Sequence, residues 1–410
     1  MTAIADLPDI RPSLLLDFAN SGRVDPRIEC TRASAATCFG PDGKLRVVPA
    51  NTPRIDYDPA TGKCLGLLVE EARRNLLRQS SLLSDTVWVK SEVLVTPSDT
   101  QNALGLSFIK LTPISGAYKT INQSLSTVIS DNQIVAFSVF AKAGEMNTIR
   151  LGVGNKASII NAGHFNLLTG EASRKEITGK YFGDGWWRVT LSGTDVSSGS
   201  ATPRVHIYSI NNGDVTTPGD GVSGLYIAAP QLEVGSFPTS YIPTEGTAVT
   251  RAADAVSIAL TLSGGGGALV MSGSVGASSP NSFMFPVRAR GVDLSQAYIG
   301  VPYVIVGGTF VSRQGYLRNA GSSRPVVVPG SAIPFSEIFK AAISWDASTV
   351  RVGINGASGS GAHSQDAPDC THIDLMTATH GGSVLGAGHV ARVAAYNALL
   401  TTTQLERLTA

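Results

Sequence analysis

Trp186 and Arg188 are the two residues whose types and spacing best suit recognition of a sugar. They stand two positions apart in the run WWRVTL, residues 186–191, so a β-strand would place both on one face. An aromatic ring can stack on the apolar face of a pyranose, and a neighbouring guanidinium donates hydrogen bonds to the hydroxyls. We therefore predict that Trp186 and Arg188 contact a ligand. A large aromatic is more often buried, so packing of Trp186 under a loop or against another subunit stays open.

Glycoside hydrolysis requires two catalytic carboxylates about 5–9 Å apart across the scissile bond. The spacing of the acidic residues in this sequence does not predict such a pair. Glu70 and Glu71 are adjacent, so on a strand they point to opposite faces, and Glu233 is isolated in its own run. The Gly-x-Ser-x-Gly pattern of a hydrolase is absent, because residues 356–361 (GASGSG) break its spacing and are expected to form a loop. We predict no catalytic residues, and therefore a protein that is not an enzyme.

Metal ligands are present as residue types but not at the spacing of a known zinc site. Four histidines lie in the last third of the chain, with a cysteine and an aspartate among them: His363, His372, His380, His389, Cys370 and Asp374. We expect no transition-metal site and no cofactor from this pattern. Asp214 and Asp220 stand in turn-rich segments, where oxygen ligands could hold a structural Ca²⁺, and that alternative stays open.

Four cysteines are too few to hold a chain of this length together as a disulfide scaffold. They are Cys30, Cys38, Cys64 and Cys370. Buried free thiols are the simplest expectation. A bridge from Cys30 to Cys38 or from Cys30 to Cys64 is the alternative.

The composition excludes several classes of protein. The 410 residues suffice for two or three domains. A net charge of +1 gives no overall field that would attract nucleic acid. The sequence contains no run of about 18 apolar residues, so no membrane span is predicted. The first 20 residues lack the basic start and apolar core of a signal peptide. We expect synthesis in a cytoplasm and no membrane insertion.

Apolar and polar residues alternate with a period of two along most of the chain, which predicts β-strands. Clear examples are 134–141 (IVAFSVFA), 148–153 and 204–210. Residues 70–77 could form one or two helical turns, and 401–408 (TTTQLERL) predict a short helix with Thr401 as its N-cap. The sequence therefore predicts an all-β protein of tandem antiparallel β-sandwiches.

Changes in turn density divide the chain into three expected domains. Residues 1–75 form a small β-rich N-terminal attachment segment, 76–250 form a first sandwich, and 251–410 form a second. The four glycines at 264–267 are either a flexible joint or a bulged loop just inside the second sandwich.

Residues 53–81, PRIDYDPATGKCLGLLVEEARRNLLRQSS, resemble a segment found in bacteriophage tail-fibre, spike and head-fibre proteins. In those proteins a Pro-Arg-aromatic turn and an Asp-Pro-x-x-Gly turn precede a Gly-Leu-Leu-x-Glu-Glu strand. Arg-x-Asn-Leu-Leu then follows, and residues 73–77 of this chain fit that ending. The likeness is long and nearly free of gaps.

Two further stretches resemble β-sandwich families. Residues 75–254 are similar to a carbohydrate-binding-module-like jelly roll of phage virion proteins, through DGWWRV at 184–189, PQLEVG at 230–235 and PTSYIPT at 238–244. The last third of the chain resembles a laminin-G or concanavalin-like sandwich, through ISW at 343–345 and VGING at 352–356. These likenesses imply a jelly roll followed by a concanavalin-like domain.

Together the resemblances imply a bacteriophage virion surface protein, of the tail-fibre, spike or head-fibre type. Its implied function is host attachment through receptor binding to surface glycans. Many copies would strengthen weak single sites, since multivalency raises avidity by about 10²–10⁴. The implied partners are other virion proteins, further copies of this chain in a homotrimer, and host-surface glycans. The implied location is the surface of the phage particle, after assembly in the cytoplasm of the bacterial host.

Two competing functions remain open. One is a purely structural decoration protein of the capsid or collar, which binds no ligand. The other is a capsule depolymerase, whose catalytic carboxylates would come from different loops or subunits and so escape detection in the sequence.

Overall fold

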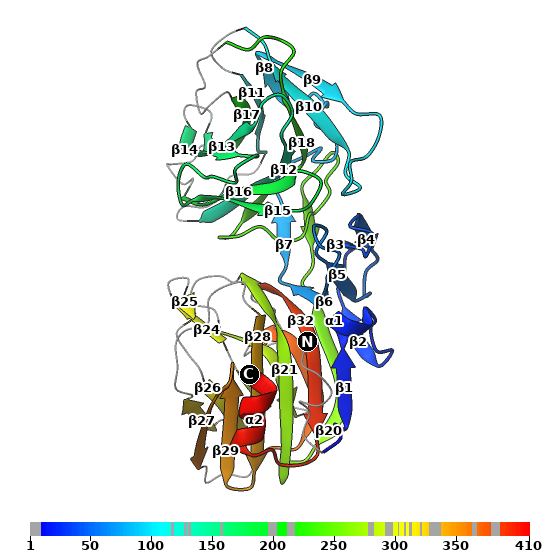
Figure 1. The fold of residues 1–410 in the computed structure, drawn as a ribbon, viewed down its shortest axis with the longest axis vertical. Helices are drawn as coiled ribbons and strands as arrows, with labels where there is room; N and C mark the ends of the chain where they lie inside the picture. Colours follow the sequence, from blue (N-terminus) through cyan, green and yellow to red (C-terminus); the bar gives the residue numbers. More distant parts are fainter. Residues whose placement is uncertain are drawn as a thin grey trace.

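Strands with alternating apolar and polar residues pair antiparallel throughout the described chain. The computed structural model describes residues 10–115, 119–126, 129, 133–155, 159–195, 203–210, 218–277, 283–291, 298–301, 303–306, 309–310, 314–319, 322–327, 338–362, 367–378 and 386–410. These strands form two β-sandwiches that lie end to end along the long axis of the molecule (Figure 1). The prediction of an all-β protein built from tandem sandwiches is confirmed.

The first sandwich, the jelly roll, packs a six-stranded sheet on a five-stranded sheet. The six-stranded sheet has the order β15 (Ile177–Tyr181), β16 (Trp186–Asp195), β12 (Ile134–Lys142), β18 (Leu225–Val234), β10 (Phe108–Pro113) and β9 (Val93–Pro97). The five-stranded sheet has the order β14 (Ile159–Asn166), β13 (Thr148–Asn155), β17 (Pro203–Ile210), β11 (Thr120–Ser124) and β8 (Val89–Ser91). Every second residue of the central strands enters the shared core, as Val135, Phe137 and Val139 of β12 do.

The second body, the C-terminal sandwich, packs an eight-stranded sheet on a nine-stranded sheet. The first sheet has the order β30 (Ala357–Ala362), β29 (Thr349–Ile354), β28 (Ile338–Asp346), β21 (Gly266–Ala277), β32 (Ala387–Tyr396), β6 (Cys64–Glu70) and β5 (Arg54–Tyr57), with β1 (Leu14–Asp17) paired to β32. The second has the order β2 (Ile28–Thr31), β20 (Ala255–Leu262), β31 (Cys370–Ala378), β22 (Phe283–Arg290), β23 (Tyr298–Gly300), β26 (Gln314–Asn319) and β27 (Ser322–Val327), with β24 (Tyr303–Val306) and β25 (Thr309–Phe310) beside it.

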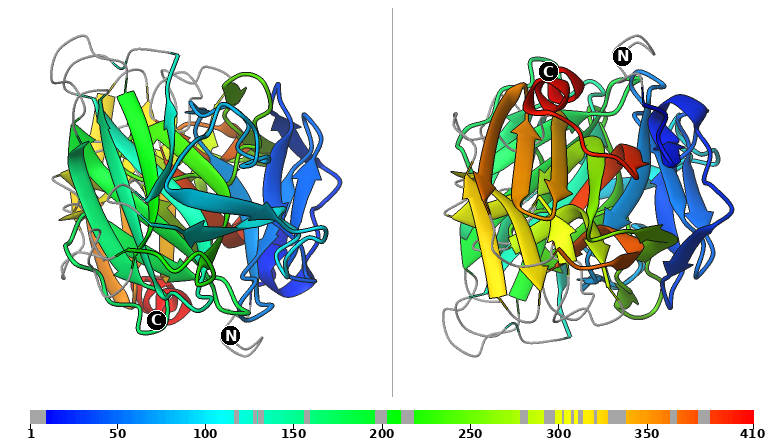
Figure 2. Two further views of the ribbon diagram at one scale, coloured as in Figure 1. Left: turned by 90° about the horizontal axis from the view of Figure 1, so that it is seen from above. Right: turned by 90° about the horizontal axis from the view of Figure 1, so that it is seen from below.

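Four strands of the N-terminal segment complete the C-terminal sandwich. Strands β1 and β6 pair with β32, β5 pairs with β6, and β2 pairs with β20. Leu14, Leu16, Leu67 and Val69 enter the same core as the strands that follow residue 255. The expected boundary at residue 75 therefore does not separate two bodies, because edge strands of the sandwich are supplied by the first 70 residues. Figure 2 shows these N-terminal strands, in blue, along one side of the molecule.

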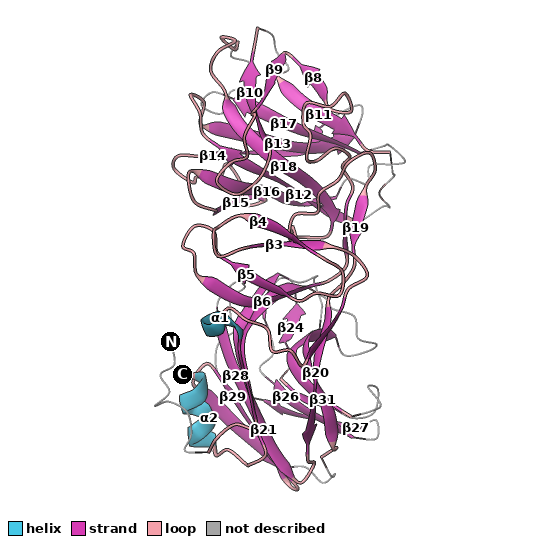
Figure 3. Cartoon of the chain, turned by 90° about the vertical axis from the view of Figure 1, so that its right-hand side faces the viewer, coloured by secondary structure: helices cyan, strands magenta, loops and turns pink. Residues whose placement is uncertain are grey.

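The jelly roll is inserted into the sequence of the C-terminal sandwich through a two-stranded neck. The chain enters the jelly roll through β7 (Arg73–Asn75) and leaves it through β19 (Val249–Arg251). These strands pair antiparallel, with Arg73 opposite Arg251. The hairpin of β3 (Ala36–Phe39) and β4 (Leu45–Val48) lies beside the neck, between the two bodies (Figure 3).

Two short helices complete the described elements. Helix α1 (Phe18–Ser21) follows β1, and α2 (Thr402–Thr409) lies across the outer face of the eight-stranded sheet, where Leu405 and Leu408 pack on Tyr396. The Thr401 side chain accepts a hydrogen bond from the backbone N–H of Gln404, whose own side chain caps the Thr401 N–H. The predicted C-terminal helix and its N-cap are confirmed. No helix in the described part of the chain is long and apolar enough to cross a membrane.

Three local predictions differ from the structure or are decided by it. The helical turns expected at 70–77 are wrong, because β6 and β7 run through that segment. The loop expected at 356–361 is also wrong: its small residues form strand β30, paired with β29 across a turn at Asn355 and Gly356. Gly264 and Gly265 connect β20 to β21 within the C-terminal sandwich, and Gly264 donates its N–H to Asp369. Gly266 and Gly267 already belong to β21, where they pair with β28. The four glycines therefore lie inside this sandwich and are not a joint between bodies.

Candidate functional site

A cleft of about 340 Å³ lies between the jelly roll and the C-terminal sandwich. Its floor is the outer face of β5, β6 and β32, because Leu67 and Val69 of β6 point into the core while Leu68 and Glu70 point out. Strands β12, β15 and β16 of the jelly roll form its roof, and the segment 237–241 lines its back. Pockets for small ligands commonly occupy such interdomain positions and have volumes of roughly 300–1,000 Å³.

An aspartate and a histidine from distant parts of the chain meet on the cleft floor. His389 of β32 lies opposite Leu68 of β6 and places its Nε2 2.8 Å from Oδ2 of Asp56, on β5. The other carboxylate oxygen of Asp56 accepts the backbone N–H of Phe39 at 2.8 Å. This pair fixes the orientation of the imidazole at the cleft floor.

Ser274 extends this pair into a line of serine, histidine and aspartate. Its hydroxyl lies 3.4 Å from Nδ1 of His389, because the two residues are direct partners across β21 and β32. A hydrolase nucleophile is activated by a close hydrogen bond and sits on a sharp strand-to-helix turn. Ser274 instead lies within an extended strand and at a longer distance. The arrangement is that of a polar row across a sheet, and it supports binding rather than acyl transfer.

Trp186 does not contact the cleft, which corrects the prediction that it binds a ligand. Its side chain is only 2% exposed, and the ring meets Phe108 edge to face at 5.7 Å between centroids. The reason is that the six-stranded sheet is covered on both faces: by the jelly-roll core on one side, and on the other by a second apolar cluster that includes Phe39, Phe140 and Tyr241. Trp186 therefore packs under another segment of the chain, which was the alternative left open by the sequence.

Arg188 does line the cleft roof, but its guanidinium is already bonded within the protein. Its Nη1 donates to the carbonyl of Thr239 at 2.7 Å, and its Nη2 donates to the hydroxyl of Ser138 at 3.0 Å. Burial lowers the pKa of Arg188 from its usual value, against the opposing effect of Glu233. These bonds use the donors that the predicted ligand contact would need. Arg188 instead links the back of the cleft to its roof.

Lys180 is the exposed cation of the cleft. It lies on β15, opposite Arg188 of β16, and its ammonium stands 5.3 Å from the centroid of the Phe182 ring. Thr178, which shares the face of Lys180, is exposed beside it. An ammonium held near an aromatic ring retains donors for a carboxylate or hydroxyl of a ligand. Nothing in the sequence singled out Lys180 or Asp56, and His389 was considered only as a metal ligand, since the proximity of the three depends on how the two bodies meet.

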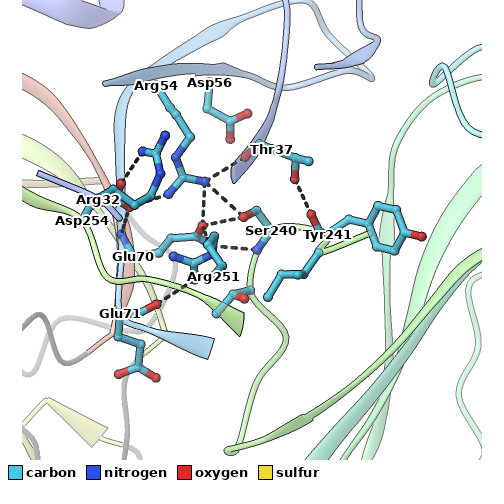
Figure 4. Close-up of polar contacts among 12 residues, drawn as sticks. Arg32, Thr37, Arg54, Asp56, Glu70, Glu71, Ser240, Tyr241, Arg251 and Asp254 are labelled. Atoms are coloured by element: carbon cyan, nitrogen blue, oxygen red, sulfur yellow. Dashed lines mark hydrogen bonds and ion pairs between the residues drawn. The ribbon is translucent and has the colours of Figure 1, made fainter. Parts of the chain in front are cut away.

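A buried network of charged residues lies behind the cleft floor and reaches the cleft through Glu70 (Figure 4). Asp254 accepts Arg32 at 2.7 Å through one oxygen and Arg54 at 2.5 Å through the other. Arg54 also donates to Glu70 at 2.9 Å, and Arg251 lies 3.6 Å from the same carboxylate. All five side chains are buried. Each charge is stabilised by the others, because an isolated charge in this environment would cost several kcal/mol.

The same network ties the jelly roll to the C-terminal sandwich. Ser240, in the segment that leaves the jelly roll, donates its backbone N–H and its hydroxyl to Glu70 at 2.7 and 2.6 Å. Thr37 donates its hydroxyl to the carbonyl of Tyr241. The contacts join residues from all three expected domains, 1–75, 76–250 and 251–410. They hold the cleft floor and cleft back in one geometry.

Acidification is expected to remove the contribution of Glu70 to stability between about pH 4.5 and pH 2. Burial would raise the pKa of Glu70, but the charges of Arg251 and Arg54 and the bonds from Ser240 outweigh it, and the pKa falls from 4.5 to about 2. A carboxyl with a lowered folded-state pKa stabilises fully above its unfolded pKa and loses this effect as pH falls through the folded value. The free energy of unfolding, measured from pH 5 to 2, should fall more steeply for the wild type than for Glu70→Gln. Equal slopes would contradict this assignment.

The other predicted ligand residues are not brought together. Asp214 lies outside the described residues, while Asp220 accepts the hydroxyl and the N–H of Ser223 and so closes its own turn. His363 and His380 also lie outside the described residues. Within the described chain, no group of three histidine, cysteine, aspartate or glutamate side chains is placed to hold a metal ion. Cys30, Cys38, Cys64 and Cys370 are all free thiols.

Comparison with known proteins finds no family model and no curated protein that matches the sequence. Among solved structures, the CBM40 module of the Ruminococcus gnavus IT-sialidase is 14% identical over 36% of this chain and 84% of its own, with a TM-score of 0.30. The NanB sialidase of Streptococcus pneumoniae is 16% identical over 35% of this chain, with a TM-score of 0.29, and the match spans 24% of its length. Domains LG4-5 of the mouse laminin alpha1 chain are 11% identical over 86% of this chain and 96% of their own, with a TM-score of 0.24.

Proposed function

We propose that this chain is a surface protein of a bacteriophage particle, a tail fibre, spike or head fibre, and that it attaches the particle to host-surface glycans. The resemblance of residues 53–81 and 75–254 to segments of phage virion proteins supports the virion role. These stretches supply Arg54, Glu70, Ser240, Arg251 and Asp254 of the buried network. The resemblance therefore covers the residues that fix the two bodies to each other, and not only isolated turns.

The cleft between the two bodies is the observation that carries glycan binding. It combines the exposed ammonium of Lys180 with the imidazole of His389 and the rings of Phe182 and Tyr57. Sugars need this mixture, because their hydroxyls require donors and acceptors while their C–H faces pack on aromatic carbon. Repeated copies of such a site on a particle would strengthen weak binding by each one.

Replacing Lys180 with alanine is expected to weaken glycan binding roughly three- to tenfold, the usual worth of one hydrogen bond to a ligand. The full-length chain would first be screened on an array of bacterial surface glycans, and the best ligand titrated by calorimetry. Lys175→Ala is the matched control, because Lys175 is exposed on the turn before β15 and does not line the cleft. Equal affinity of the Lys180→Ala and wild-type chains would remove the cleft from the proposal.

The virion role needs a separate experiment. Antibodies against the full chain should label phage particles purified from cells that produce it, at a fixed position on the head, collar or tail. Unlabelled particles would refute the virion assignment. Labelled particles whose protein binds no glycan on the array would instead identify a structural decoration protein.

A further inference from the structure

A second charged surface lies on the jelly roll, on the face of the five-stranded sheet that points away from its core. Residues Ile149, Leu151 and Val153 of β13 enter the core, as do Val205 and Ile207 of β17. Their alternate neighbours therefore share the opposite face. These neighbours are three basic side chains and a tyrosine: Arg150, Arg204, His206 and Tyr208.

The strand register places these four side chains in one patch. Arg150 is the direct partner of Tyr208, and its guanidinium stands 5.2 Å from the centroid of the tyrosine ring. The His206 ring stacks parallel to the Tyr208 ring, at 5.9 Å between centroids and 14° between planes. Arg204 follows on the same strand and donates its Nε–H to Ser124 at 2.9 Å. We call these four residues the basic patch.

The positive charge of the basic patch is not neutralised by the part of the chain that the structure describes. The described ion pairs of the jelly roll join Lys110 to Glu145, Lys142 to Asp184 and Arg174 to Glu176. Neither Arg150 nor Arg204 pairs with a carboxylate among the described residues. Burial, together with the charges of Arg204 and Arg150, lowers the pKa of His206 from 6.5 to about 4.

Two features of the basic patch favour a bound ligand. The buried Nδ1 atom of His206 has no hydrogen-bond partner among the described residues, although buried polar atoms normally have one. Residues 152 and 154, which face His206 and Arg204 across the strand pair, are glycines and place no side chain beside the two basic residues. Glycine weakens a strand interior and often marks a close approach by another molecule.

We infer that the basic patch binds an acidic glycan, with carboxylates paired to Arg150 and Arg204 and a hydroxyl bonded to His206. Arginine suits this role because its planar donors match the two oxygens of a carboxylate. Asn122, the partner of His206 on β11, is buried and donates its side-chain amide to the carbonyl of Val89, so it supports the sheet below the patch. The inference goes beyond the proposed function, since it concerns another face of the jelly roll and a ligand defined by its charge.

The test uses an oligomer of galacturonic acid as the acidic probe, titrated against the full-length chain by calorimetry. We expect Arg150→Ala and Arg204→Ala each to weaken binding roughly tenfold, since each removes a charged hydrogen bond. Binding should also weaken as salt is raised from low to physiological concentration. Arg174→Ala is the control, because Arg174 belongs to the same sandwich but is already paired with Glu176.

Three results of the titrations would overturn the inference. Equal affinity for a neutral oligosaccharide of the same length, or unchanged binding by the double variant Arg150→Ala and Arg204→Ala, would overturn the inference. Loss of uronate binding in Lys180→Ala alone would also overturn it and would leave the cleft as the binding site. If an arginine variant does not fold, the wild-type His206 imidazole is followed by NMR instead. A bound carboxylate should raise the pKa of His206, and an unchanged pKa at saturation would exclude the patch.

Discussion

Replacing Asp254 with alanine is expected to lower the free energy of unfolding by about 3–5 kcal/mol, because it leaves two buried guanidinium groups without their shared partner. Arg32 and Arg54 both pair with this carboxylate, and the backbone N–H of Glu70 donates to it at 2.9 Å. The side chain itself is almost completely buried, so water cannot replace it. Urea unfolding followed by tryptophan fluorescence would measure the loss.

Glu176→Ala provides the comparison for Asp254→Ala. Glu176 forms an ion pair with Arg174 at 3.0 Å, on the exposed surface of the jelly roll. Exposed pairs contribute about 0–1 kcal/mol. A change in Asp254→Ala as small as in Glu176→Ala would show that the network contributes little to stability. Asp254→Asn keeps the shape and part of the hydrogen bonding, so its loss should lie between the two.

Replacing Trp186 with alanine is expected to cost about 3–5 kcal/mol, the range seen when a buried aromatic is truncated in a core. Trp186 packs between the six-stranded sheet and the hairpin of β3 and β4, so the cavity would open next to the cleft roof. Trp186→Phe should lose much less, since it keeps most of the buried ring. The loss is measured by urea unfolding followed by circular dichroism, since the substitution removes a fluorophore.

The affinity of the folded Trp186→Ala variant separates a packing role from a binding role. Glycan binding at low temperature, where the variant remains folded, should stay within about threefold of the wild type. A ligand-stacking tryptophan would give the opposite pattern, with a loss of affinity of roughly 1–3 kcal/mol and little change in stability. That result would restore the sequence-based prediction.

The features that the sequence predicted are those determined by residues close together in the chain. Alternation along β12 and β16 predicted their strands, and Thr401 with Gln404 predicted the start of α2, because these signals act within a few positions. Trp186 and Arg188 also share one face of β16, as expected. The error was to expect this face to be open, when the second apolar cluster covers it.

The candidate site could not be predicted, because its residues are far apart in the sequence. Asp56 and His389 are separated by 333 positions, and Arg54 and Asp254 by 200. No local pattern encodes such a pairing. A partial signal was present in a chain with only 15% charged residues. Arg54 and Glu70 lie in the stretch 53–81, and Arg251 and Asp254 lie at the end of the stretch 75–254, both of which carried the resemblance. Charged residues within apolar strands predict buried partners, but they do not say which ones.

The insertion of the jelly roll into the C-terminal sandwich sets the order in which the protein can fold during synthesis. Strands β1 and β6 pair with β32, which the ribosome makes more than 300 residues after β6. The jelly roll, in contrast, has all of its strands between residues 89 and 234 and can fold as soon as they emerge. The first 70 residues must then wait with their pairing edges unfilled, tethered beside a finished domain by the neck. A ribosome that stalls before β32 would therefore release a chain with a native jelly roll and aggregation-prone N-terminal strands.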